Sequence, residues 1–196
     1  MKKTSTVFVG KPLKHMQEGG APMELDLLTV HRMQSGDTQT VEDFVRQYYP
    51  QILRYCYLHI FDRGDAEDMT QETFARFFRN LDQYRHYGKL RSFLYAIAAN
   101  VCRDYHRKRK DLLMDQIPEE GTEPMPQVEL RLDVRRALER LPREQRDVVV
   151  LYYFQGCRKK EIGQILGIGE SLVRYRLKRA ADQLREFLGE DNVWDG

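Results

Sequence analysis

Long apolar runs and cysteine pairs, which mark membrane and metal-binding proteins, are missing from this 196-residue sequence. The longest apolar run, Val148 to Phe154, is far shorter than the ~20 residues that a membrane helix needs, so we expect no membrane insertion. Cys56, Cys102 and Cys157 lie far apart and show no CxxC or Cys/His spacing, which argues against a metal site. Sparse cysteines inside apolar helical patterns indicate core residues in a reducing, cytoplasmic protein.

Catalytic motifs are also missing. The sequence has no Walker motif, nucleophile elbow or HExxH pair, and its carboxylates do not gather as a metal-binding cluster. His86 and His106 lack partners at metal-ligand spacing. We therefore expect no catalytic residue, no metal and no cofactor, which disfavours a nucleic-acid-processing enzyme.

The formal net charge of +2 hides a strong segregation of sign along the chain. Residues 85–110 carry eight Lys or Arg against Asp104, a net of +7, and residues 158–179 carry seven against two acids, a net of +5. Residues 111–130, between these blocks, hold six acids and no Lys or Arg. Two basic blocks divided by an acidic segment indicate two surfaces that face polyanions.

Hydrophobic periodicity predicts an all-α protein with two small helical domains joined by an acidic flexible linker. Residues 1–22 show no helical period and are expected to form a flexible leader. Met23 begins the first helical pattern, so Met1 and Met23 are both candidate starts of translation. Residues 23–110 form the first domain, in which a break at Asp62 to Asp65 lets Asp65 cap the helix that runs to Leu81. Residues 111–130, with prolines among acids, form the linker, 131–190 the second domain and 191–196 a tail.

The second domain is predicted to contain helices at 134–141 and 143–154 and a helix–turn–helix at 159–166 and 170–188. On the last helix the apolar residues at 173, 177, 180 and 184 share one face, and cations, a hydroxyl and a phenol occupy the other. Such a face either binds duplex DNA or is simply solvated, and the glycine-containing turn with the preceding basic run favours DNA. Leu172 either contacts a thymine methyl or rims the core. The candidate duplex-binding residues are Arg158, Lys159, Lys160, Ser171, Leu172, Arg174, Tyr175, Lys178 and Arg179.

Two faces of the first domain also carry candidates. Asp65, Asp68, Gln71 and Glu72 project from one helix, where they either dock a basic partner or only confer solubility, and periodicity alone favours solubility. The 84–87 loop alternates aromatics with cations and precedes a basic helix, a composition typical of single-strand binding. Its tyrosines, and Tyr95, are equally well explained as packing residues. The candidate strand-binding residues are Tyr84, Arg85, His86, Asn100, Arg103, Arg107 and Lys108.

The segment DAEDMTQETF at 65–74 resembles the "DAEDLVQETF" signature of extracytoplasmic-function sigma factors, which are small two-domain bacterial initiation factors. Residues 90–110 resemble the family's next segment, an aromatic-Leu-Tyr-x-Ile-Ala-x-Asn pattern followed by Asp and a basic run. Residues 137–188 resemble its C-terminal domain, including "LP-x-x-x-R-x-V" and "E-I-x-x-x-L-G-I". The resemblance covers about residues 25–188, with both halves in the family's order.

The resemblance implies a role for each face. The acidic helix face would dock the β′ clamp helices of core RNA polymerase, which reverses the solubility interpretation, and the β flap and an anti-sigma factor are further partners that it implies. The 84–87 loop would capture a flipped base of the −10 element, the 100–108 face would hold the melted strand, and the second domain would read the −35 element as duplex. The linker resembles the segment that enters polymerase toward the RNA exit path. A stand-alone helix–turn–helix regulator is the alternative, but it would need neither the acidic signature nor the loop.

This sequence departs from the family pattern at several positions. Phe93 stands where the family usually has Trp, and Ala99 where a basic residue is common. In the helix–turn–helix, Arg158 and Gly169 replace frequent serines, and Leu172 replaces a frequent threonine. The promoter sequence therefore does not transfer from relatives.

Overall fold

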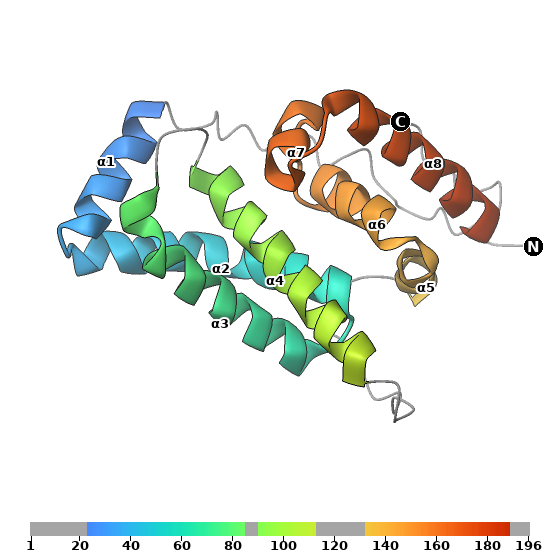
Figure 1. Cartoon of the computed structure of the whole chain (residues 1–196), viewed down its shortest axis with the longest axis horizontal. Helices are drawn as coiled ribbons and strands as arrows, with labels where there is room; N and C mark the ends of the chain where they lie inside the picture. Colours follow the sequence, from blue (N-terminus) through green and yellow to red (C-terminus); the bar gives the residue numbers. More distant parts are fainter. Residues whose placement is uncertain (1–22, 85–89, 113–131, 189–196) are drawn as a thin grey trace, which may run out of the picture. The chain divides into compact units, whose positions relative to one another are not determined.

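The computed structural model describes residues 23–84, 90–112 and 132–188 (Figure 1). Those residues are helical or lie in short turns, with no strand among them, which confirms the all-α prediction. The chain divides into two compact units. The predicted leader, the tail, most of the linker, Arg85 and His86 lie outside the described residues.

The described part of the N-terminal unit contains four helices and a short 3-10 turn. Its elements are α1 (Met23–Gln34), α2 (Thr38–Ile60), α3 (Arg63–Arg79), the turn η1 (Leu81–Gln83) and α4 (Leu90–Leu112). The three long helices α2, α3 and α4 pack pairwise against one another, and α1 packs against α2 (Figure 1).

Aromatic and aliphatic side chains fill the core between the three long helices. Ile52, Tyr55, Phe77 and Leu94 are fully buried, and the rings of Phe77 and Phe44 stack with centroids 4.8 Å apart. Cys56 and Cys102 are buried in this core and Cys157 is buried in the C-terminal unit, as the sequence predicted, and none of the three forms a disulfide. The apolar faces expected from the helical spacing thus form the core of this unit.

Only two residues separate α2 from α3. Phe61 adopts a left-handed backbone conformation (φ 61°, ψ 11°), and its N–H donates to the Tyr57 carbonyl. Asp62 is the N-cap of α3, because its side chain accepts a hydrogen bond from the Asp65 N–H at 2.9 Å. The prediction that Asp65 caps this helix is therefore wrong. Gly64 lies inside the first turn of α3, so the break is shorter than the sequence suggested.

Helix α1 makes hydrogen bonds on either side of the segment that joins α3 to α4. The Gln34 amide donates to the Leu81 carbonyl at 3.0 Å. The Asp26 carboxylate accepts from the Leu90 N–H at 3.1 Å, and it thereby caps the N-terminus of α4 from another helix. The ends of this segment are thus held by α1, a contact that no local sequence signal indicated.

The C-terminal unit consists of α5 (Leu132–Arg140), α6 (Arg143–Val149), the π-helical turn η2 (Val150–Phe154), α7 (Lys159–Leu166) and α8 (Glu170–Leu188). Helices α5 and α6 pack against α8. The buried stripe of α8 is the one predicted: Val173, Leu177, Ala180 and Leu184. The predicted helix at 143–154 is helical throughout, but its last five residues wind as a π-helix, a form common at functional sites.

Candidate nucleic-acid interface

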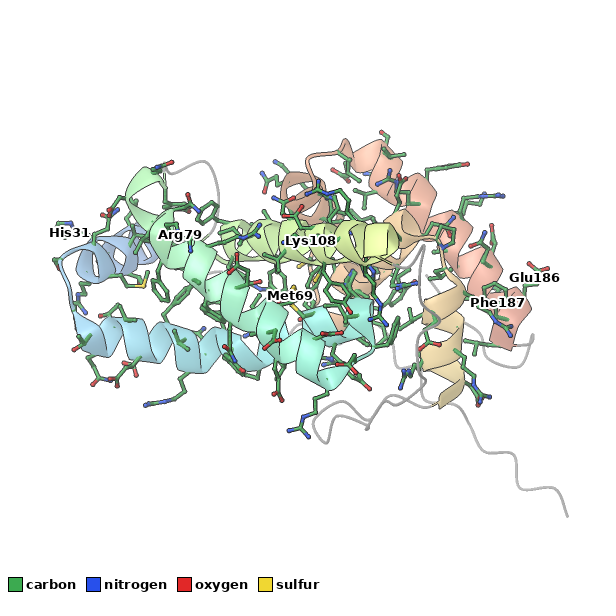
Figure 2. All side chains as sticks on the ribbon, turned by 60° about the horizontal axis from the view of Figure 1, so that its bottom comes forward. His31, Met69, Arg79, Lys108, Glu186 and Phe187 are labelled. Carbon is green, nitrogen blue, oxygen red and sulfur yellow. The ribbon has the colours of Figure 1, made fainter. Side chains whose placement is uncertain are left out.

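The acidic face of α3 presents two polar side chains that no other part of the described structure engages. Asp68 and Gln71 are exposed, and neither makes a hydrogen bond or ion pair with another described residue. They belong to the same helix as Met69, which is half-buried and labelled in Figure 2. Both side chains are therefore available to a partner.

The other two predicted members of this face are held by internal contacts. Asp65 is half-buried and accepts a hydrogen bond from the Tyr105 hydroxyl at 2.5 Å, with the Arg109 guanidinium 3.5 Å away. Burial and the Asp65 contact raise the pKa of Tyr105 to about 12. Glu72 accepts a hydrogen bond from Arg76 at 2.6 Å. The four predicted acidic-face residues thus fall into two groups, one free and one occupied.

Arg76 joins the acidic face of α3 to α4. Its second donor reaches the Asp104 carboxylate at 3.0 Å, and Asp104 also pairs with Arg107 at 3.0 Å. The hydrogen bond from Arg76 lowers the pKa of Asp104, and the bonds to Glu72 and Asp104 raise the pKa of Arg76. Four charged side chains from two helices therefore form one continuous cluster, which sequence reasoning did not predict.

The predicted strand-binding residues of α4 share an exposed surface. Asn100, Arg103, Arg107 and Lys108 are all exposed. Arg103 donates to the Asn100 side chain at 2.7 Å, which fixes a cation beside an amide. Lys108 lies toward the C-terminal end of α4 (Figure 2). This surface combines charge with hydrogen-bonding groups, as a phosphate backbone requires.

The aromatic candidates near the start of α4 differ in exposure. Tyr84 is half-buried, its ring lies 5.0 Å from that of Phe93, and burial raises its pKa. Tyr95 is fully buried and meets Tyr55 edge-on at 5.6 Å. Tyr95 is therefore a packing residue, which settles one of the alternatives left open by the sequence, whereas Tyr87 lies outside the described residues.

The turn between α7 and α8 depends on glycine at two positions. Gly167 has a φ of 67°, a left-handed conformation that favours glycine. Gly163 lies where α7 approaches the turn: an added Cβ would come within 2.8 Å of the Ile168 carbonyl oxygen, and the Ile168 N–H donates to the Gly163 carbonyl at 2.9 Å. The Gly169 carbonyl accepts from the N–H groups of Leu172 and Val173, so the first turn of α8 begins without a side-chain cap.

The outer face of α8 is exposed along its length. Ser171, Arg174, Lys178 and Arg179 are exposed, and Arg174 pairs with Glu170 at 2.6 Å, which lowers the pKa of Glu170. Lys178 and Arg179 make no ion pair with any side chain that the structure describes. Two apolar side chains on this face, Leu172 and Tyr175, are 39% and 60% exposed.

The basic run before α7 is only partly free. Arg158 and Lys160 are exposed, whereas the Lys159 ammonium lies 5.4 Å from the ring centre of Tyr152 in η2. Sequence reasoning also missed that Arg176 pairs with Glu144 of α6 at 2.5 Å. Arg176 thereby ties α8 to α6 instead of facing outward with its basic neighbours.

Two features of other protein classes are absent from the described residues. None of their His, Cys, Asp and Glu side chains gather in a group of three or more that could hold a metal ion. No helix in the described ranges has the length and hydrophobicity to cross a membrane.

Family models match both units. The model described as "Sigma-70 region 2" matches residues 44–111, and the model described as "Sigma-70, region 4" matches residues 131–184. Region 2 thus covers α3 and most of α2 and α4, and region 4 covers α5 to α7 and most of α8.

Curated relatives span the same two regions. The chain is 35% identical over 159 residues to the ECF RNA polymerase sigma factor SigE of Mycolicibacterium smegmatis, a match that covers 76% of this chain and 62% of that relative. It is 31% identical over 176 residues to ECF sigma factor SigW of Bacillus subtilis, covering 81% of this chain and 94% of that one. It is 31% identical over 174 residues to ECF sigma factor SigM of Mycobacterium tuberculosis, covering 87% of each.

Solved structures share the fold. CnrH in complex with the cytosolic domain of CnrY superimposes with a TM-score of 0.65 at 22% identity, covering 83% of this chain and 96% of that one. RpoE of Bartonella quintana in complex with the anti-sigma factor NepR gives 0.66 at 23% identity, covering 76% and 96%.

Region 2 followed by region 4, on an all-α fold with an acidic face and two exposed cationic surfaces, defines a sigma-70-type transcription initiation factor. The chain belongs to the family of ECF RNA polymerase sigma factors, which direct RNA polymerase to promoters. A stand-alone helix–turn–helix regulator does not account for the region 2 match over 44–111.

Proposed function

We propose that the two units divide promoter recognition between them. Residues 23–110 bind core polymerase and the −10 element as a melted strand, residues 131–190 read the −35 element as duplex, and the acidic segment 111–130 runs toward the RNA exit path. The segregation of exposed groups supports this division: the exposed Asp68 and Gln71 are on α3, and the exposed cations are on α4 and α8. The protein acts in the cytoplasm by binding and not by catalysis.

Core polymerase is contacted through the free part of the acidic face. Asp68 and Gln71 meet the β′ clamp helices directly, because both are exposed and unengaged among the described side chains. Asp65 and Glu72 support this face through the contacts with Tyr105 and Arg76. The C-terminal unit in turn meets the β flap.

The melted −10 strand follows α4. Arg107 and Lys108 neutralise phosphates, and the Arg103–Asn100 pair presents donors to the backbone or a base. Tyr84, Arg85 and His86 at the loop capture a flipped base, and stacking worth ~1–3 kcal/mol per base offsets the cost of unstacking. An anti-sigma factor that covers these surfaces would hold the protein inactive.

A binding and transcription experiment tests the polymerase contact. We expect the double substitution Asp68→Ala with Gln71→Ala to weaken binding to purified core polymerase and to reduce run-off transcription from a promoter that wild-type holoenzyme uses. Binding of the full chain to duplex DNA should stay unchanged. The matched control is Glu42→Ala, which removes an exposed acid from α2. Equal loss of core and DNA binding, or equal loss in the control, would contradict the assignment.

The salt dependence of duplex binding tests the C-terminal unit. Lys178 is exposed and unpaired among the described side chains, so Lys178→Ala should lower the slope of log K against log salt by about 0.9 if one phosphate contact is lost. Arg136→Ala, which removes an exposed cation from α5, should leave the slope unchanged. An unchanged slope for Lys178→Ala would place this lysine outside the DNA contact.

A further inference from the structure

Two exposed apolar side chains stand on the otherwise polar outer face of α8. Among the described residues the large hydrophobic side chains that are clearly exposed are Leu28, Leu172, Tyr175 and Phe187. Leu172 and Tyr175 lie three residues apart on one helix and therefore adjoin each other. A pair of this kind leaves apolar area in water that a partner can cover.

The packing of α8 fixes the direction of this pair. Val173 and Leu177 are buried on the opposite side, so α8 cannot rotate to cover Leu172 and Tyr175 without exposing its core stripe. At 3.6 residues per turn, Arg179 falls on the same line as the apolar pair, at i+7 from Leu172. Along this side of α8, Leu172, Tyr175 and Arg179 therefore follow one another from the N-terminal end of the helix.

Charge around the pair identifies its occupant as duplex DNA and not an apolar protein. Ser171, Lys178 and Arg179 flank the two side chains, and all three are exposed. A polyanion would form ion pairs with Lys178 and Arg179, whereas burial under an apolar partner would remove their charges from water without providing an opposite charge. The major-groove edge of DNA offers one apolar group, the C5-methyl of thymine.

We propose that Leu172 and Tyr175 together hold a thymine methyl group in the major groove of the duplex bound by α8. Leu172 and Tyr175 favour thymine at this position by excluding water from its methyl group, while the neighbouring cations position α8 on the phosphate backbone of the DNA. This inference rests on the proposed function, because it requires that the C-terminal unit read duplex DNA.

Replacement of thymine by uracil tests the contact, since uracil lacks only the methyl group. The full chain first selects a site from a pool of duplexes with randomised base pairs. The selected duplex is then resynthesised with deoxyuridine at one thymidine position at a time. For wild-type protein we expect one position at which uracil weakens binding about fourfold, the effect of one buried carbon group. In Leu172→Ala, uracil at that position should have no effect.

Two further variants separate this contact from general damage. Phe187→Ala removes an exposed apolar ring elsewhere on α8 and should keep the uracil effect (Figure 2). Tyr175→Phe should also keep it, because the ring is retained. A selected duplex that is insensitive to uracil everywhere, or a Leu172→Ala variant that stays sensitive, overturns the methyl contact alone. If wild-type protein selects no sequence, duplex reading fails and the inference fails with it, which leaves a protein partner for this face.

Discussion

Replacing Gly163 with alanine is expected to destabilise the helix–turn–helix. An alanine Cβ at this position would lie 2.8 Å from the Ile168 carbonyl oxygen, whereas ordinary contacts begin at 3.4 Å. The backbone must therefore move apart by about 0.6 Å, because the obstructing atom belongs to the main chain and not to a flexible side chain. The same movement strains the hydrogen bond from the Ile168 N–H to the Gly163 carbonyl.

The size of the effect follows from two opposing terms. Overpacking of a tight site costs about 1–3 kcal/mol. Alanine in place of glycine inside a helix stabilises the folded state by about 0.5–1 kcal/mol. Taking the middle of each range, we expect Gly163→Ala to lower the free energy of unfolding of the C-terminal unit by about 1 kcal/mol. Duplex DNA binding should weaken as well, because the start of α8 is displaced.

Gly64→Ala provides a matched control on α3. A Cβ at Gly64 meets only the Asp62 carboxylate oxygen, at an ordinary contact distance of 3.5 Å. Gly64→Ala should therefore raise the free energy of unfolding slightly, because alanine favours the helix more than glycine does. Urea unfolding followed by circular dichroism measures both variants, and amide hydrogen exchange assigns the change to α7 and α8. The steric reasoning is refuted if Gly163→Ala is as stable as wild type and exchange in α8 is unaltered.

Three further expectations concern the N-terminal unit. The hydrogen bond from Arg76 lowers the pKa of Asp104, so the stability that it supplies is present above the ordinary carboxyl value of 3.8 and declines as the pH falls through the lower folded value. As the pH is lowered, the free energy of unfolding should therefore decline less in Asp104→Asn than in wild type. Parallel pH curves for the two proteins would argue against this contribution of Asp104. Tyr105→Phe should cost about 1 kcal/mol by removing the hydrogen bond to Asp65, and a double-mutant cycle with Asp65→Asn should show coupling between the two. Phe77→Ala should cost about 3–5 kcal/mol because the ring is fully buried, and a loss below 1 kcal/mol in urea unfolding would contradict that packing.

Elements with a strong amphipathic period could be predicted from the sequence. The bounds of α7 and α8 agree with the predicted 159–166 and 170–188, because the apolar spacing and the glycine turn both mark them. The stripe from Val173 to Leu184 is buried for the same reason. The division into two helical units also follows from the sequence, because prolines among acids interrupt the helical periodicity at residues 111–130.

Contacts between residues far apart in sequence carried no such signal. Arg76 lies 28 residues from Asp104, and Asp26 lies 64 residues from the Leu90 N–H that it caps, so neither contact follows from helical spacing. The α3 cap was predicted at Asp65 because its acidic side chain suits a helix start, but Phe61 turns the chain earlier and leaves that role to Asp62. The occupied state of the Asp65 carboxylate depends on the same long-range packing.

The guanidinium of Arg76 is shared by carboxylates from two helices that we assign to different partners. A charge change at Glu72 therefore redistributes Arg76 toward Asp104 and alters how firmly Asp104 restrains Arg107. A substitution of Glu72 should then register in strand binding as well, so a defect measured with one partner does not identify the only contact of that residue.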